Sequence, residues 1–105
     1  MAVAEISVIP IGTKTASIGN YVSSVVALLS QRAKQYGLKY ELTAMCTQIE
    51  GSPHDIFAVA QEIHEYLFRS YPDLCRVVTA LKIDDRRDKE LTLKGKVESV
   101  LARLG

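Results

Sequence analysis

The sequence lacks the features that mark several large classes of proteins. It has no excess of charge of either sign, because 13 basic and 12 acidic residues leave a formal net charge of +1. Domains that bind nucleic acid usually carry a clearly basic surface, so this balance argues against such a partner. No apolar run approaches the roughly 18 residues of a membrane span, and the N-terminus has no charged region followed by an apolar one. We therefore expect a cytosolic protein with no nucleic-acid partner and no membrane partner.

Residues that bind metals or perform catalysis are also scarce. The two cysteines, Cys46 and Cys75, lie far apart and cannot supply the four thiolates of an iron–sulfur cluster. Because disulfides are rare in the cytosol, we expect two free thiols. The two histidines, His54 and His64, belong to no recognisable catalytic or metal-binding motif, so structural or surface roles are favoured for both. We expect no metal and no cofactor.

Aromatic residues make up only 7% of the chain and tryptophan is absent, whereas 48% of the residues are hydrophobic. The core must therefore be built mainly from aliphatic side chains. A chain of 105 residues suits one domain. A domain of this size buries about two-thirds of its unfolded surface, so association with further copies would add useful stability.

Two stretches carry clear signals for helices. Apolar residues recur at helical spacing over residues 18–36, which predicts a long amphipathic helix with Ser17 as its N-cap and Gly37 as its end. A second helix is predicted to begin after Ser52, which is a good N-cap, with Pro53 at the first helical position.

Alternating apolar and polar residues predict four strands. They cover residues 4–13, 38–45, 46–51 and 74–83. The order of strand, helix, strand, strand, helix and strand is the split βαβ pattern of a ferredoxin-like sandwich. We therefore predict an α+β fold of this type in a single domain, with an additional C-terminal helix.

Two helices can cover only one face of a four-stranded sheet, so the other face must meet water, a ligand or another subunit. We expect buried side chains at Ile6, Val8, Val25, Leu29, Leu42, Ile56, Ile63 and Leu81. The alternation places on the open face Glu5, Ser7, Ile9, Glu41, Thr43, Met45, Val78, Ala80 and Lys82. Because this set is half apolar, we infer that the open face is buried against a partner subunit.

The fourth strand runs into seven consecutive charged residues of alternating sign, residues 84–90. Helical spacing then predicts a last helix over residues 93–104, capped by Asp88 or Thr92. Self-pairing of the charged segment across a symmetric subunit contact and a solvated loop of surface pairs both remain open. A catalytic site is disfavoured here, because no nucleophile or metal cluster accompanies the arginines.

Several ungapped motifs in the right order resemble the thiamine-binding protein family. They are "VIPIGT…S…YV", "Y.LTAMCTQIEG", "IHEYLF" and "RVVTALKIDDRRD…L..KVESV", and together they extend roughly from Ala4 to Leu101. The usual "TPMGT" of the family reads "TAMCT" here, so that Ala44 and Cys46 replace a proline and a glycine. The resemblance implies a ferredoxin-like, non-enzymatic protein that binds thiamine or its hydroxymethylpyrimidine moiety. It also implies assembly through the sheets, and we expect a homotetramer built as a dimer of dimers, or failing that a dimer.

A pyrimidine would need a narrow slot with donors and acceptors for its ring nitrogens and its amine. Our candidate ligand-binding residues are Thr13, Ser17, Thr43, Thr47 and Glu50, because they fall at loop and strand ends and are expected around one rim of the fold. Glu50 would accept a hydrogen bond from the amine, and the hydroxyls would orient the ring.

Two other functions stay open. The first is a structural or regulatory module that only assembles and binds no small molecule. The second is an acyl-phosphate hydrolase on the same topology, which is less favoured because it needs an arginine in the loop before the first helix, where "IPIGTKTAS" has none.

Overall fold

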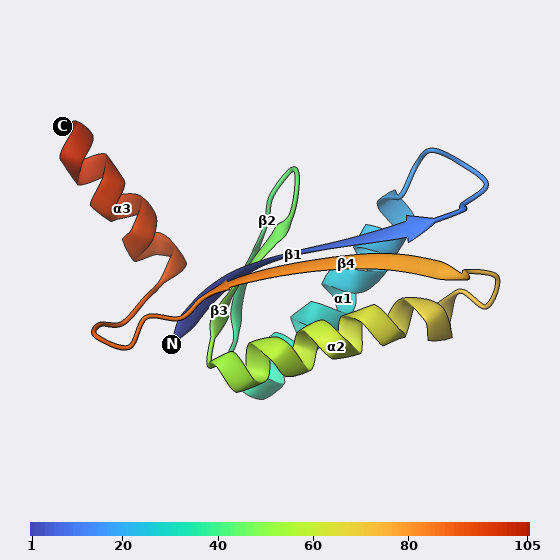
Figure 1. Ribbon diagram of the computed structural model, residues 1–105, viewed down its shortest axis with the longest axis horizontal. Coiled ribbons are helices and arrows are strands. Elements are labelled where there is room, and N and C mark those ends of the chain that lie inside the picture. The colour runs from blue at the N-terminus through green and yellow to red at the C-terminus, as the bar shows by residue number, and fades with distance from the viewer.

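Seven elements follow one another in the order that the sequence predicts, in a computed structural model that describes residues 1–105. The four strands form one antiparallel sheet in the order β2-β3-β1-β4, which is the ferredoxin-like arrangement (Figure 1). The elements are β1 (Ala2–Ile11), α1 (Gly19–Tyr36), β2 (Lys39–Leu42), β3 (Thr47–Gly51), α2 (Pro53–Ser70), β4 (Arg76–Asp84) and α3 (Leu93–Leu104).

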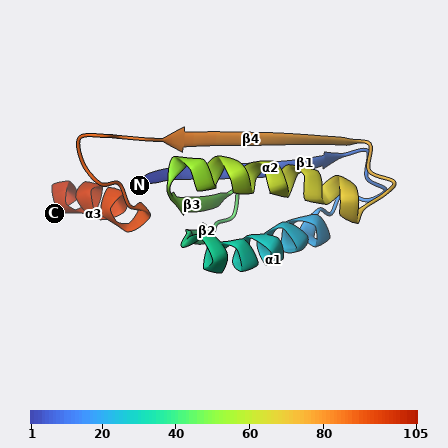
Figure 2. The same ribbon diagram turned by 90° about the horizontal axis from the view of Figure 1, so that it is seen from below.

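The helices α1 and α2 lie side by side on one face of the sheet, whereas α3 lies beyond its end (Figure 2). The core fills the space between this helix pair and the sheet. Its fully buried side chains are aliphatic, as the composition predicts, and the largest are Leu29, Ile49, Ile56, Ile63, Leu67 and Val59. None of the helices combines the length and the hydropathy that a bilayer-spanning segment needs.

The helix ends confirm most of the predicted caps. Gly37 ends α1 with φ of 70°, in the left-handed region where glycine has no steric cost. The Ser52 hydroxyl accepts a hydrogen bond from the Asp55 N–H, with Pro53 in the first turn of α2. Of the two candidate caps of the last helix, Thr92 is the one used, and its hydroxyl accepts from the Gly95 N–H at 2.9 Å.

The predicted cap of the first helix is wrong. Ile18 occupies the cap position of α1 and makes no side-chain cap hydrogen bond. The preceding loop uses its own hydroxyls instead: Thr13 Oγ1 donates to the Thr15 carbonyl at 2.8 Å, and Thr15 Oγ1 donates to the Ser17 carbonyl at 3.2 Å. Ser17 is therefore tied into the loop through its backbone, and its side chain is left exposed.

The predicted core is largely confirmed, with one error. Of the eight positions expected to be buried, Val8 and Leu81 are only half-buried, and Leu42 is 55% exposed. Leu42 is the last residue of the edge strand β2 and projects over a cavity rather than into packed side chains. The other five are buried, namely Ile6, Val25, Leu29, Ile56 and Ile63.

The hairpin between β2 and β3 turns earlier than the alternation predicts. Strand β2 ends at Leu42, so Thr43 and Met45 lie in the turn instead of continuing the strand. The turn is closed by a backbone hydrogen bond from the Thr43 N–H to the Cys46 carbonyl at 2.9 Å. Only Gly12 and Gly37 have positive φ, so Cys46 replaces the usual glycine of the family motif without backbone strain.

The open face of the sheet carries the predicted mixture of side chains. Ile9 and Val78 are each 44% exposed on it, in the strands that also carry the charged Glu5 and Lys82. Helix α3 reaches this side only at its first turn and has no buried residue. More than half of each side chain is exposed along its apolar stripe, which consists of Val97, Val100, Leu101 and Leu104.

Candidate functional site

The five predicted ligand-binding residues do not share one site. Thr43 and Thr47 line a cavity beside the hairpin turn. Thr13 and Ser17 line a second cavity, and Glu50 lines a third one under α3. The expectation that all five meet at one rim is therefore wrong, because almost the whole length of β1 lies between Glu50 and the loop before α1.

The cavity beside the hairpin turn has the character of a small-molecule site. We call it the hairpin cavity. It has a volume of about 380 Å³, and its walls come from β1, the first half of α1 and the β2–β3 turn. Binding sites for small molecules are typically apolar hollows of roughly 300–1,000 Å³ with a few polar groups that fix orientation. Ten of its 13 lining residues are hydrophobic, and the set is Ile6, Ser7, Val8, Ile9, Ile18, Val22, Val25, Leu42, Thr43, Ala44, Met45, Cys46 and Thr47.

The polar groups of the hairpin cavity gather at the turn. Thr43 Oγ1 donates to the Cys46 carbonyl at 2.7 Å, and Ser7 Oγ lies 3.5 Å from the Met45 carbonyl. The Cys46 thiol lies 3.7 Å from a carboxylate oxygen of Glu5 on the open face. Polar side chains therefore meet a ligand at one end of the cavity, while the other lining side chains can only pack against it.

The second cavity lies at the far end of β1, between the loop before α1 and the loop after α2. It has a volume of about 460 Å³ and mostly polar walls. Its floor is already internally bonded, since the Tyr71 hydroxyl lies 2.7 Å from Ser24 Oγ and its ring packs on Tyr21 with centroids 4.5 Å apart. Thr13 donates its hydroxyl proton within its own loop. Its lining is far less apolar than that of the hairpin cavity, with three hydrophobic residues among twelve.

Glu50 has a structural role that sequence reasoning did not find. The residue is 4% exposed, and Oε1 accepts a hydrogen bond from the Leu93 N–H at 2.7 Å, at the first residue of α3. Its other oxygen lies 3.8 Å from Lys39 Nζ. A carboxylate at a helix N-terminus satisfies a free backbone donor and interacts favourably with the helix dipole. Glu50 thus ties the C-terminal helix to the sheet.

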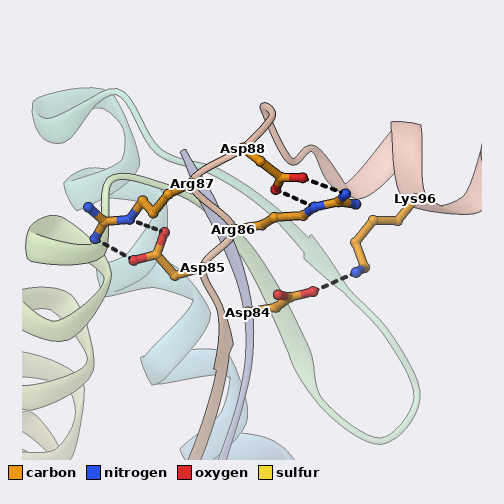
Figure 3. Close-up of polar contacts among 6 residues, drawn as sticks. All are labelled: Asp84, Asp85, Arg86, Arg87, Asp88 and Lys96. Carbon is orange, nitrogen blue, oxygen red and sulfur yellow. Dashed lines mark hydrogen bonds and ion pairs between the residues drawn. The ribbon is translucent and has the colours of Figure 1, made fainter.

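The charged segment pairs its charges within the chain (Figure 3). Arg87 donates to both carboxylate oxygens of Asp85, at 2.8 and 2.6 Å, and Arg86 contacts both oxygens of Asp88. These hydrogen bonds hold the pKa of Asp85 and of Asp88 below the usual aspartate value. Lys96 of α3 reaches back to Asp84 at 2.6 Å.

The intrachain pairs favour one of the two interpretations of this segment. They are exposed ion pairs of the kind that adds little to stability. The structure thus agrees with a solvated loop of surface pairs, since six of the seven charged residues have a partner within the chain and Lys89 is the exception. No nucleophile or metal-binding group of three His, Cys, Asp or Glu side chains accompanies them.

His64 makes contacts that fit the structural role predicted for it. Its Nδ1 lies 2.6 Å from the Thr79 hydroxyl, and its ring packs edge-on against Phe68. These contacts join α2 to β4, on the side of the sheet away from the open face. Neither His64 nor Thr79 lines any of the cavities of the molecule, which agrees with a structural contact.

Sequence reasoning missed the apolar walls and the backbone of the hairpin cavity. The helical spacing over residues 18–36 does not reveal that Ile18 and Val22 line the cavity from α1. The signal that points to the cavity is Pro10, because a proline cannot donate to a neighbouring strand and is tolerated only where the sheet edge is free.

Comparison with known proteins identifies the family. Residues 4–101 match the sequence profile described as "Thiamine-binding protein". The chain belongs to the thiamine-binding protein family. It is 49% identical to UPF0045 protein YqgV of Bacillus subtilis over 100 residues, which covers 95% of this chain and 94% of that protein.

Solved structures of relatives of the thiamine-binding protein family share the fold. The crystal structure of protein MJ1052 from Methanocaldococcus jannaschii superposes with a TM-score of 0.80 at 39% identity and covers 94% of each chain. A Thermotoga maritima protein, whose description names thiamine biosynthesis or salvage, superposes with a TM-score of 0.74 over 94% of this chain and 97% of its own. At 23% identity the latter shows the fold alone.

Proposed function

We propose that this chain binds thiamine or its hydroxymethylpyrimidine moiety in the hairpin cavity, in the cytosol and without catalysing a reaction on it. The observation that carries the proposal is an apolar cavity of about 380 Å³ in a member of the thiamine-binding protein family. Apolar walls with polar groups at one end suit a methylated pyrimidine, which has two flat apolar faces and a polar edge. The Thr43 hydroxyl and the buried Thr47 belong to the proposed site.

The proposal assigns no ligand contact to the other three candidates. Thr13 and Ser17 lie at the second cavity, and the carboxylate of Glu50 is occupied by α3. The Cys46 thiol of the hairpin cavity lies 3.7 Å from a carboxylate, and no histidine or other cationic side chain lines the cavity, so the arrangement supports binding rather than nucleophilic catalysis.

We also propose a homotetramer built as a dimer of dimers, in keeping with the exposed apolar groups on two surfaces. One is the open face with Ile9 and Val78, together with the adjacent hairpin turn, where Met45 is 88% exposed. The other is the apolar stripe of α3. Contiguous apolar surface of this kind is uncommon on monomers and marks interaction sites. If neither compound binds, these surfaces favour the assembly-only function.

The experiment is a calorimetric titration of three proteins with thiamine and with hydroxymethylpyrimidine. Val22→Phe places a ring in the hairpin cavity from α1, and it should lower the affinity at least tenfold by excluding the ligand. Val26→Phe is the matched control, since Val26 is half-buried on the same helix and does not line the cavity. Equal affinity of the two variants would place the ligand elsewhere, and a wild type that takes up neither compound would overturn the proposal.

A further inference from the structure

The central strand β1 has a free edge that lies in the wall of the hairpin cavity. On one side β1 pairs with β4 along almost its whole length, from Val3 to Ile11. On the other side its pairing with β3 stops at Ile6 opposite Thr47, because the chain enters the hairpin turn there. Beyond Ile6 no strand lies on that side of β1.

The hydrogen-bonding pattern fixes which backbone groups face this edge. In an antiparallel pair the hydrogen-bonded residues alternate, and both backbone groups of one residue point to the same neighbour. The bond from the Thr43 N–H to the Cys46 carbonyl shows that these two residues form a hydrogen-bonded pair, so the backbone groups of Cys46 point to the β2 side. The next residue, Thr47, therefore faces β1, and its partner Ile6 faces β3. Two residues further along β1, the N–H and C=O of Val8 point the same way, where no strand is present.

Pro10 agrees with this assignment. Its backbone has the same direction as that of Val8, so its missing N–H lies at the free edge and leaves the ladder with β4 intact. The edge therefore presents one donor, the Val8 N–H, and two acceptors, the carbonyls of Val8 and Pro10. Backbone groups in an apolar wall need partners, since an unpaired buried group costs free energy comparable to a lost hydrogen bond.

We propose that the free edge of β1 at Val8 recognises the amino-substituted edge of a pyrimidine. This inference rests on the proposed function. A ring nitrogen next to an exocyclic amine presents one acceptor beside one donor. This is the pattern that a residue of a neighbouring strand presents to its partner, so the pyrimidine replaces one residue of the missing strand. The Val8 N–H donates to the ring nitrogen, and the Val8 carbonyl accepts from the amine. Ile9 and the α1 wall then pack against the ring.

This mode of recognition predicts a requirement for the amine. Removing it leaves the Val8 carbonyl unpaired in an apolar wall, and sites built to pair a polar group strongly reject analogues that lack it. The deamino analogue of hydroxymethylpyrimidine should therefore bind at least about tenfold more weakly than the parent compound.

The test combines this comparison with NMR of the intact protein. On titration with hydroxymethylpyrimidine, the Val8 amide proton should shift downfield and exchange more slowly with solvent. The Ile9 amide is the internal control, because it points to β4 and already has a partner strand. Methyl signals of Val22 report occupancy of the cavity independently of the backbone.

The outcomes separate the two proposals. If the parent compound binds and moves the Val22 methyl signals, while the Val8 amide is unchanged and the deamino analogue binds equally well, the edge-recognition inference is wrong and the binding function stands. If no compound binds, both proposals fall. A third outcome is a Val8 amide that is protected from solvent exchange without ligand, more strongly at higher protein concentration and with no change on adding the ligand. The edge then pairs with another copy, and the inference is overturned.

Discussion

Single residues near the ends of the strands decide which parts of this molecule are free to bind a ligand. Glu50 shows this most clearly, because its carboxylate is nearly fully buried and engaged by a backbone N–H that lies 43 residues further along the chain. A glutamate before a glycine is a reasonable ligand-binding candidate when only the sequence is considered. The arrival of α3 over the end of the sheet turns it into an anchor for that helix.

The anchoring role of Glu50 predicts different effects for two substitutions. Glu50→Gln keeps an oxygen that can accept from the Leu93 N–H, so stability should change little and affinity for hydroxymethylpyrimidine should stay within twofold. Glu50→Ala removes the acceptor and should cost about 0.5–2 kcal/mol, the usual range for a lost helix cap. Hydrogen exchange at the Leu93 amide and urea unfolding measure both effects.

The two substitutions also separate the structural role from a ligand-binding one. A tenfold loss of ligand affinity in Glu50→Gln, with unfolding unchanged, would return Glu50 to the binding site. Unaltered exchange at Leu93 in Glu50→Ala would show that the carboxylate does not hold α3.

At the scale of elements, the helix pair is joined by a partly buried bridge. Arg32 of α1 donates from Nε to the Glu62 carboxylate of α2 at 2.7 Å. This hydrogen bond holds the pKa of Glu62 below its usual value, against the opposing effect of burial. A carboxylate with a lowered folded-state pKa stabilises the fold at neutral pH and loses that contribution as the pH falls through the folded-state value.

The bridge predicts a pH-dependent difference between the wild type and Glu62→Gln. The wild type should have the higher melting temperature at pH 7, and the difference should shrink as the pH falls from about 5 and vanish when Glu62 is protonated in both states. Glu65→Gln is the control on the same helix. Glu65 pairs with Arg69 at 3.9 Å, so the loss of its charge should change the melting temperature much less. A melting-temperature difference that is constant from neutral to acid pH would show that the charge of Glu62 does not matter.

The elements also show what the sequence can predict. Helix ends at Gly37, Ser52 and Thr92 depend on residues within one turn, and these predictions hold. Leu42 and the hairpin cavity depend on where β3 stops against β1, a relation between distant segments that alternation does not encode. The alternation of β1 itself was right, but it describes side chains, whereas the proposed recognition uses its backbone.

The whole molecule is elongated, 48 Å along its longest axis, because α3 extends away from the sandwich (Figure 1). Within one chain more than half of each residue of its apolar stripe stays exposed. Together with the exposed apolar groups on the open face, this shape fits a subunit whose surfaces are completed by further copies. The fold of one subunit was predictable from its sequence, but the arrangement of copies depends on surfaces that single-chain periodicity only suggests.

Assembly through α3 predicts that a charge in its apolar stripe will lower the number of subunits in the oligomer. We expect light scattering to report a homotetramer for the wild type and a smaller species for Leu101→Glu, since a carboxylate cannot be buried there without a partner. Ala102→Glu on the same exposed helix, outside the stripe, should leave the mass unchanged. A wild type that is monomeric at micromolar concentration would contradict the assembly, and equal masses for all three proteins would exclude α3 from the contact.

The most direct test of the central claim is to locate hydroxymethylpyrimidine on the protein by intermolecular nuclear Overhauser effects at saturating ligand. We predict contacts from the methyl group of the pyrimidine to the methyl groups of Val22 and Ile9, which line the hairpin cavity from α1 and β1. Contacts instead to Tyr21 and Tyr71 in the second cavity, or to Leu93 and Val97 beside Glu50, would contradict the claim.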